Sequence, residues 1–269
     1  MEKILSLFYL LTSLLFLFCP TLAGNWYEVA IVAVGSVVVK TLFPMMVLTR
    51  LISASPLFRF ITKPILKIRL WKRLSLSDTL LLPVLGGILS GFPTVARDAE
   101  KLYKSGAITK KEGEKALLLA SAPSPAFLIR LGGENALQGT LLFLISISVS
   151  YIVASLTKSE KSDGANINSP LSLPSAVSSS AYTALTVSAN VIFFTFLSHI
   201  FLPLTPILEL GSGSVILKGS IFRPFLVGFG GISALCQIKA EAPSLSARGY
   251  IKARILTGSI FFIIFFLFC

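Results

Sequence analysis

The stretch LLLPVLGGILSGFPTV, residues 80–95, decides the fold of this chain. It is apolar but short, and prolines and glycines interrupt it at Pro83, Gly86, Gly87, Gly91 and Pro93. A through-going helix would lose several backbone hydrogen bonds here, and the hydrocarbon of a bilayer cannot replace them. We therefore expect a re-entrant hairpin that is buried inside the protein.

The composition around this stretch is that of a polytopic membrane protein. Of the 269 residues, 54% are apolar and 13% are charged, and the mean hydropathy is +0.83. A soluble domain carries roughly 25% charged residues, so this chain lacks the polar surface that covers a globule in water. The 24 Lys and Arg residues outnumber the 12 Asp and Glu residues. Because the basic residues lie between apolar segments, they indicate orientation in a lipid bilayer and attraction to anions, and no nucleic-acid partner is expected.

Apolar stretches of about 20 residues predict the helices that cross the bilayer. The first, residues 4–22, is either a retained helix or a signal peptide, because Lys3 precedes it and Thr-Leu-Ala-Gly ends it. Gly106 suits the end of a helix at residues 97–104, and Thr109-Lys-Lys-Glu112 is a capping box for the next helix. We predict an all-α protein with five or six spans and two re-entrant hairpins. The other expected spans are residues 29–52, 137–156, 184–204 and 251–268.

A second interrupted stretch, residues 222–238, repeats the plan of the first. Leu85-Gly-Gly-Ile-Leu-Ser90 is similar to Phe229-Gly-Gly-Ile-Ser233, and each precedes a charged segment and another apolar helix. Basic residues concentrate in the loops of one side, so the two hairpins are expected to enter from opposite faces. This order predicts two inverted repeats with a substrate site near the midplane. The expected units are an N-terminal hydrophobic helix or signal peptide (1–24), a first repeat (25–157), a flexible polar linker (158–180) and a second repeat (181–269).

Two longer segments carry a resemblance to a known family. Residues 86–133, GGILSGFPTVARDAEKLYKSGAITKKEGEKALLLASAPSPAFLIRLGG, resemble the first gate motif of the YlbJ-type sporulation integral membrane proteins. Residues 225–241, FLVGFGGISALCQIKAE, and residues 250–258, YIKARILTG, resemble the second. These proteins belong to a wider group with a nucleoside-recognition or Gate domain. The resemblance covers most of the chain from Val29 onward.

The resemblance implies a membrane transporter, or a component of one, for a small anionic or heteroaromatic solute. The implied solute is nucleoside-like or dipicolinate-like, and in the sporulation branch it is dipicolinate that passes toward the developing spore. The implied location is the bacterial inner membrane or the forespore membrane. The alternative function is a non-transporting scaffold that assembles with a partner membrane protein, and a homo-oligomer also stays open.

The candidate solute-binding residues are one membrane charge and a set of small or polar residues. Lys40 lies in the middle of its span, where a charge costs roughly 2.5–3.5 kcal/mol. It is interpreted as a binding residue or counter-ion for an anion, so Lys40→Met should abolish uptake. The alternatives are a later helix start that lets Lys40 reach the interface, or a pair with a carboxylate. The other candidates either contact solute or pack helices closely: Gly86, Gly87, Ser90, Gly91, Pro93, Thr94, Ser121, Ser124, Asn190, Gly230, Gly231, Ser233 and Gln237.

The sequence offers little for catalysis. It contains no P-loop, no Cys-x-x-Cys and no acid–base pair inside an apolar segment, so a lipid-modifying enzyme is disfavoured. One histidine and three scattered cysteines suit no metal site, and no metal or other cofactor is expected. The basic residues from Arg59 to Arg73 are interpreted as topological charges that contact lipid headgroups. Arg97-Asp98 is interpreted as part of a solvated helix face, and the alternative is a salt bridge of the gate.

Overall fold

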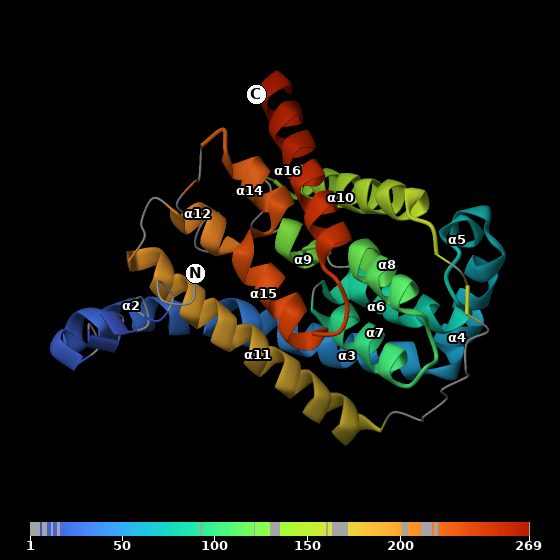
Figure 1. Cartoon of the computed structure of the whole chain (residues 1–269), viewed down its shortest axis with the longest axis horizontal. Coiled ribbons are helices and arrows are strands. Elements are labelled where there is room, and N and C mark those ends of the chain that lie inside the picture. The colour runs from blue at the N-terminus through green and yellow to red at the C-terminus, as the bar shows by residue number, and fades with distance from the viewer. Residues whose placement is uncertain are drawn as a thin grey trace.

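The computed structural model describes residues 6, 10, 11, 13, 14, 17–91, 93–120, 122–129, 135–159, 161, 162, 172–200, 204–210, 217 and 220–268. Within these ranges every regular element is helical, as expected (Figure 1). The α-helices are α2 (Pro20–Ala33), α3 (Phe43–Ala54), α4 (Pro56–Thr62), α5 (Arg69–Leu74), α6 (Leu81–Ser90), α7 (Thr94–Lys104), α8 (Lys110–Ala120), α9 (Pro125–Phe127), α10 (Ala136–Leu156), α11 (Leu173–Ile200), α12 (Thr205–Leu208), α14 (Arg223–Phe229), α15 (Gly231–Glu241) and α16 (Arg248–Phe268). A π-helix, η1 (Val34–Leu42), and two 3₁₀-helices, η2 (Lys63–Lys67) and η3 (Asp78–Leu80), connect them.

Three of the described helices are long and apolar enough to cross a membrane, by length and composition. They are Ala136–Leu156, Leu173–Ile200 and Arg248–Leu267. The first and third match the expected spans at 137–156 and 251–268, and the second overlaps the span expected at 184–204 but begins eleven residues earlier. A fourth candidate is the pair Val38–Ala54 and Pro56–Lys67, which is bent by 76°. The protein is therefore an integral membrane protein. The described part has fewer spans than the five or six expected, and eight of residues 4–22 lie outside it.

The expected span at residues 29–52 belongs to a longer helical rod. The chain is helical without interruption from Pro20 to Ala54, with η1 between α2 and α3. A π-helical segment widens the backbone locally, and such segments are frequent at functional sites. The rod ends at Ser55, whose hydroxyl caps α4 by accepting a hydrogen bond from Phe58 N at 3.1 Å. The sharp bend at Ser55 turns α4 and η2 back toward the rest of the molecule.

Both interrupted stretches contain helix breaks at glycine. Gly91, with φ +78°, separates α6 from α7, and Gly230, with φ +90°, separates α14 from α15. Residues with a Cβ rarely adopt such backbone conformations, so these two positions require glycine. The broken helix expected in each half is confirmed. The inverted relation between the halves stays a prediction.

The predicted helix ends between α7 and α8 are confirmed. Gly106 has φ +73°, and Ala107 N donates to Leu102 O at 3.0 Å, which closes the end of α7. Thr109 and Glu112 form the capping box, because Thr109 N donates to Glu112 Oε2 at 2.9 Å and Glu112 N donates to Thr109 Oγ1 at 3.2 Å. These contacts fix a tight α7–α8 corner.

The linker expected at residues 158–180 is shorter than predicted. Helix α11 begins at Leu173, so its first two turns occupy the end of that segment. The serines and proline there suggested a loop, but helix N-termini favour both residue types. The remainder of the segment lies mostly outside the described residues.

The largest hydrophobic core joins the two halves of the chain. It is built from α5–α8 together with side chains of α10, α15 and α16. Leu80 and Leu117 from the first half and Ile238 from the second are fully buried in it. Figure 1 shows α15 and the start of α16 beside α7 and α8, and α11 crossing the rod of α2 and α3. The halves therefore share one core instead of folding separately.

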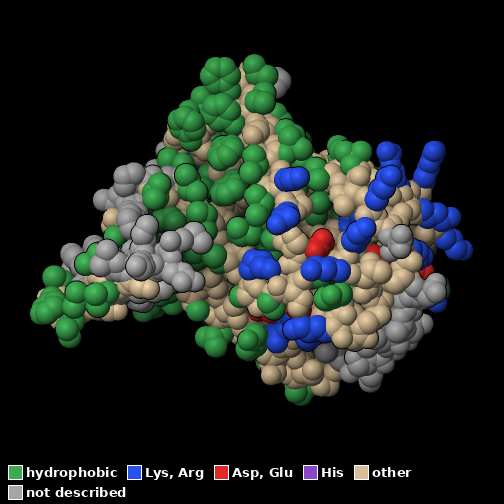
Figure 2. Space-filling view, viewed as in Figure 1, with side chains coloured by type: hydrophobic (Ala, Val, Ile, Leu, Met, Phe, Trp, Pro, Cys, Tyr) green, Lys and Arg blue, Asp and Glu red, His purple; other side chains and the backbone are tan. Residues whose placement is uncertain are grey.

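The surface separates into a basic part and an apolar part. Lys and Arg side chains gather over the right half of the view in Figure 2, where α5, α7 and α8 lie in Figure 1. Hydrophobic side chains cover α2 and the outer half of α16. Exposed apolar residues on these two helices include Ile31, Val32, Ile263 and Phe266. This division agrees with a lipid-facing region and a basic aqueous face.

Candidate functional site

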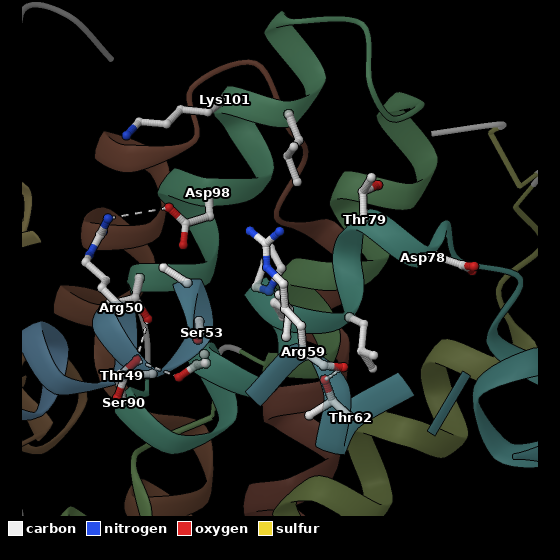
Figure 3. A pocket seen from close by; sticks show the side chains of 18 of the residues that line it. Thr49, Arg50, Ser53, Arg59, Thr62, Asp78, Thr79, Ser90, Asp98 and Lys101 are labelled. Atoms are coloured by element: carbon white, nitrogen blue, oxygen red, sulfur yellow. Dashed lines mark hydrogen bonds and ion pairs between the residues drawn. The ribbon is translucent and has the colours of Figure 1, made fainter. Parts of the chain in front are cut away.

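A cavity of about 840 Å³ lies where α3, α4, α6 and α7 meet (Figure 3). Met46, Thr49 and Arg50 of α3 form one wall, and Ser90 and Thr94, on either side of the first helix break, form another. Several lining residues are four positions apart on one helix, so they lie on the same helix face. Thr49 and Ser53 on α3 obey this spacing, as do Asp98 and Leu102 on α7. The cavity thus lies beside the stretch from which the fold was predicted.

The cavity lining is rich in positive charge. Two of its basic residues are paired, because Arg50 Nη1 lies 3.7 Å from Asp98 Oδ1 and Lys161 Nζ lies 2.8 Å from Asp78 Oδ1. Figure 3 shows Arg50 and Asp98 pointing toward one another. The lining contains five basic side chains and two acidic ones, so it carries an excess of three positive charges. The basic side chains are Arg50, Arg59, Lys63, Lys101 and Lys161, and the acidic ones are Asp78 and Asp98.

Arg50 is the buried cation of this site. Its side chain is 10% exposed, and its Nε and Nη2 atoms are buried without a hydrogen-bond partner. Buried polar groups in proteins are nearly always hydrogen-bonded, and a guanidinium offers five donors in a fixed planar arrangement. Asp98 accounts for one nitrogen only. The guanidinium as a whole is suited to bind a carboxylate or phosphate group, and a group in the cavity would reach these two buried nitrogens after a shift of the surrounding side chains.

Loss of hydration also acts on Lys101. Its side chain is exposed, but the surrounding protein removes enough water to lower the pKa of its ammonium group. Asp98 opposes this shift, whereas the neighbouring guanidinium groups of Arg97 and Arg50 lower the pKa further. An anion bound in the cavity would raise the pKa of Lys101, since it favours the charged form.

Hydroxyl groups hold the break between α6 and α7 in shape. Ser90 Oγ donates to Gly86 O at 2.8 Å, and Thr94 Oγ1 donates to Gly91 O at 3.0 Å. The two hydroxyl oxygens are 2.6 Å apart. The second of these bonds engages the carbonyl group of Gly91, which lies at the break between the two helices. Ser90 and Thr94 are therefore positioning residues that also face the cavity.

Small residues let the break pack closely against the neighbouring helices. A Cβ on Gly87 would lie 2.7 Å from Val95 Cβ, and one on Gly91 would lie 2.9 Å from Ser124 N. Ser124 is buried, and its hydroxyl accepts from Phe127 N at 3.2 Å to cap α9. Of the predicted residues of the first break, Gly86, Gly87, Ser90 and Thr94 line the cavity. Gly91, Pro93 and Ser124 are buried and do not line it, although Gly91 packs against Ser124.

The predicted residues of the second half lie elsewhere. Gly230 and Gly231 form the break between α14 and α15 and do not line the cavity. Gln237 Nε2 donates to Ser233 Oγ at 3.1 Å, while Gln237 Oε1 is buried without a partner. Asn190 donates to Thr186 O of its own helix at 2.9 Å. None of these five residues lines the cavity.

Two further candidates have different outcomes. Lys40 is exposed in η1 and is absent from the cavity lining. Ser121 lies outside the described residues. The interpretation of Lys40 as a solute counter-ion therefore has no support from the cavity. Arg50, near the end of the same expected span, is the basic residue of that span that lines the cavity.

Several residues of the cavity were missed from the sequence. Arg59 and Lys63 were interpreted as topological charges, yet both line the cavity. Their spacing of four residues, which places them on one helix face, was the available signal. Arg50 falls within the apolar stretch at residues 29–52, as Lys40 does, and the same rule about membrane charges applies to it.

Arg97 does not belong to a solvated face, which was one of its two interpretations. Its Nη1 donates to Ser179 O at 2.6 Å and to Thr183 Oγ1 at 2.9 Å, and its guanidinium lies 4.5 Å from the ring centroid of Tyr182. Its Nε lies 3.7 Å from Glu241 Oε2. Arg97 therefore connects α7 to α11 and α15 across the two halves.

The fold and the cavity define a helical integral membrane protein with a basic internal site. Among the described residues, no group of three or more His, Cys, Asp or Glu side chains could hold a metal ion. No family model, no curated protein and no solved structure matches the chain. The arguments for function therefore rest on the site itself.

Proposed function

We propose that the protein is a transporter, or the solute-binding component of one, for a small organic anion. The observation that carries this proposal is the cavity, in which the excess of basic residues coincides with buried, unpartnered nitrogens on Arg50. The cavity volume of about 840 Å³ falls within the range of roughly 300–1,000 Å³ that is usual for small-molecule sites.

The charge of the cavity favours a dicarboxylate over a neutral nucleoside. A nucleoside would leave the donors of Arg50 and the excess positive charge without a counter-ion, whereas two carboxylates would meet both needs. Dipicolinate, the solute implied by the resemblance to sporulation membrane proteins, is a planar heteroaromatic dicarboxylate. We infer that it represents the solute class, and that the protein acts in a bacterial inner or forespore membrane.

The helix break supplies a means of opening the site. Broken helices in transporters expose backbone groups near the midplane and let one half move against the other. Here Ser90 and Thr94, on either side of the break at Gly91, line the cavity, while Arg97 connects α7 to α11 and α15. Movement of the α6–α7 unit relative to α11 and α15 would change access to the cavity. The proposed mechanism assumes that the two halves are inverted repeats, as the sequence predicts.

The test is counterflow of radiolabelled solute into proteoliposomes that contain the purified full-length chain. We expect exchange with dipicolinate and little exchange with uridine. Arg50→Gln should lower the dipicolinate rate roughly tenfold or more, because a lost charge-assisted hydrogen bond costs about 1.5–3 kcal/mol. Arg69→Gln is the matched control, since Arg69 is exposed on α5 and does not line the cavity.

The outcomes separate the proposed transporter from its alternatives. Equal rates for Arg50→Gln and Arg69→Gln would move the site away from this cavity. A wild-type protein that exchanges neither dipicolinate, nucleosides nor nucleobases, although it is folded in the vesicles, would favour the scaffold that assembles with a partner membrane protein.

A further inference from the structure

Arg254 is a buried charge inside a membrane-spanning helix. It lies in α16 and is 1% exposed. Among the described residues it has the largest side chain that is fully buried. Its Nη1 donates to Ser146 Oγ at 2.9 Å and its Nη2 donates to Ser150 Oγ at 2.5 Å. Both serines are on α10 and are buried. The guanidinium thus joins two candidate spans away from the cavity described above.

No carboxylate neutralises this guanidinium in the described part of the chain. The ion pairs found there involve Asp78, Asp98, Glu100 and Glu241, and none of them includes Arg254. Charges in membrane segments are almost always paired, and an unpaired buried charge is costly. Serine hydroxyls satisfy hydrogen bonds but supply no negative charge. A neutralising group is therefore missing from the described contacts of Arg254.

The surroundings of Arg254 also contain more donors than acceptors. Arg254 Nε is buried without a partner, and so is the hydroxyl of Tyr250, a residue that is 3% exposed. Ser146 and Ser150 accept from Arg254, and their own hydroxyl protons have no acceptor among the described contacts. Arg254 Nε and the Tyr250 hydroxyl are thus two buried donors without an acceptor among the described residues, and the hydroxyl protons of Ser146 and Ser150 are two more protons available beside them. A ligand that only accepts hydrogen bonds would satisfy them.

The second helix break lies next to this cluster. Tyr250 and Arg254 are one turn apart on α16, and the guanidinium lies 5.9 Å from the Tyr250 ring centroid. The Tyr250 hydroxyl lies 3.5 Å from the position that a Cβ on Gly230 would occupy. Because Gly230 has no side chain, the backbone of the break leaves room beside this hydroxyl.

We propose that a small inorganic anion, of which chloride is the type, binds at Arg254 between α10, α16 and the break at Gly230. The anion neutralises the guanidinium and accepts from Arg254 Nε and from the hydroxyls of Tyr250, Ser146 and Ser150. Water is the poorer occupant, since it carries no charge and brings two more protons that need acceptors. A small ion fits better than an organic solute, because Arg254 is almost inaccessible to solvent. This site is independent of the proposed transport function.

The test measures thermal unfolding of the purified full-length chain in detergent, with sodium chloride or sodium gluconate at equal ionic strength. We expect the unfolding temperature to rise with chloride and to saturate, because a ligand that binds only the folded state stabilises it by mass action. Arg254→Gln should abolish this rise. Arg248→Gln should keep it, since Arg248 is exposed at the start of the same helix. Equal curves in chloride and gluconate for the wild type would overturn the proposal, and so would a full chloride response in Arg254→Gln.

Two further measurements decide the proposal if Arg254→Gln does not fold. Tyr250→Phe removes one donor and should raise the chloride concentration for half-maximal stabilisation severalfold; an unchanged concentration would contradict the site. Crystals grown in sodium bromide should show an anomalous peak within hydrogen-bond distance of Arg254 Nε. Bromide peaks that occur only elsewhere would overturn the proposal.

Discussion

Arg97 of α7 and Glu241 of α15 form an ion pair that connects the two halves of the chain, with Arg97 Nε 3.7 Å from Glu241 Oε2. The pair is largely buried, since the side chains are 19% and 5% exposed. Arg97 also reaches Ser179 O and Thr183 of α11. Burial raises the pKa of Glu241, and the charge of Arg97 opposes that shift. One side chain thus holds three helices together beside the cavity.

Replacement of Arg97 should loosen this connection. Arg97→Gln removes the ion pair and leaves the Glu241 carboxylate buried without its cation, so we expect a loss on the order of 2–3 kcal/mol in the free energy of unfolding. Chemical denaturation in detergent measures it. Lys104→Gln is the control on the same helix, because the Lys104 pair with Glu100 is exposed at the lysine end and is worth less. Similar losses in the two variants would show that Arg97 does not connect the halves.

Substitution of Gly91 and of Gly106 distinguishes the cost of backbone strain from the cost of a steric clash. Both have positive φ, but a Cβ on Gly91 would lie 2.9 Å from Ser124 N, while nothing lies within 4 Å of one on Gly106. Gly106→Ala should therefore cost about 1 kcal/mol from strain alone. Gly91→Ala should cost more, and it should also displace Ser124 and reduce solute exchange. The ratio of exchange rate to folded protein measures the second effect, and a Gly91→Ala variant with normal exchange would exclude a functional break.

Gly228 and Gly258 allow α14 and α16 to meet backbone to backbone. A Cβ on Gly228 would lie 2.6 Å from Gly258 Cα, which no rotamer change can relieve. We expect Gly228→Ala to lower the unfolding temperature strongly, because backbone shifts of this kind cost typically 1–3 kcal/mol or more. Gly24→Ala, with nothing within 4 Å of the new methyl group, should leave the temperature unchanged or slightly raised. Equal behaviour of the two variants would refute the close contact.

Glu112 should make the stability of the protein sensitive to acid. It is fully buried, and burial raises the pKa of its carboxyl group, but hydrogen bonds from Thr109, Ser162 and Ser77 outweigh burial and lower the pKa below 4.5. A pKa lowered in the folded state stabilises the fold above the unfolded value, and this stabilisation is lost as the pH falls through the folded value.

Glu112→Gln tests this dependence directly. We expect it to cost about 1–3 kcal/mol at pH 7, because one amide oxygen cannot accept from the three backbone N–H groups around it. Unfolding curves between pH 3 and pH 7 should then show the wild type and the variant converging at the acid end. Glu28→Gln, at an exposed position on α2, should follow the wild type. A constant difference across the pH range would refute the predicted pKa.

Lys40 distinguishes the sequence-based prediction from the structural one. The sequence alone predicts that Lys40→Met abolishes uptake, because the lysine lies in the middle of an apolar stretch. The structure places Lys40 at an exposed position outside the cavity, so we expect Lys40→Met to keep solute exchange within about twofold of the wild type. Loss of exchange with a normal amount of folded protein would return Lys40 to the transport path.

The local features of the fold were readable from the sequence because they depend on neighbours in the chain. The breaks at Gly91 and Gly230 and the capping box at Thr109 and Glu112 follow from backbone conformation and from bonds across three residues. The three long apolar helices follow from composition. The start of α11 was not readable, because serines and prolines serve both in loops and in first turns of helices.

The site depended on contacts that no local pattern encodes. Ser90, Thr94 and Asp98 share a stretch of sequence, but the approach of α3 and α4 to them follows from the bend at Ser55 and from packing. The sequence alone therefore predicted that Arg59 and Lys63 belong to a basic loop, whereas in the structure both line the cavity. Arg97 and Glu241 are far apart in the chain, so their pairing also required the fold.

Helix α11 has a consequence for the lipid environment of the protein. Its 28 residues extend for about 42 Å at 1.5 Å per residue, whereas the hydrocarbon core of a typical bilayer is about 30 Å thick. The helix must either tilt or carry its serine-bearing first turns into the headgroup layer, and each choice has an energy that depends on acyl-chain length. Vesicles with longer acyl chains should therefore accommodate the protein with less distortion than those with short chains.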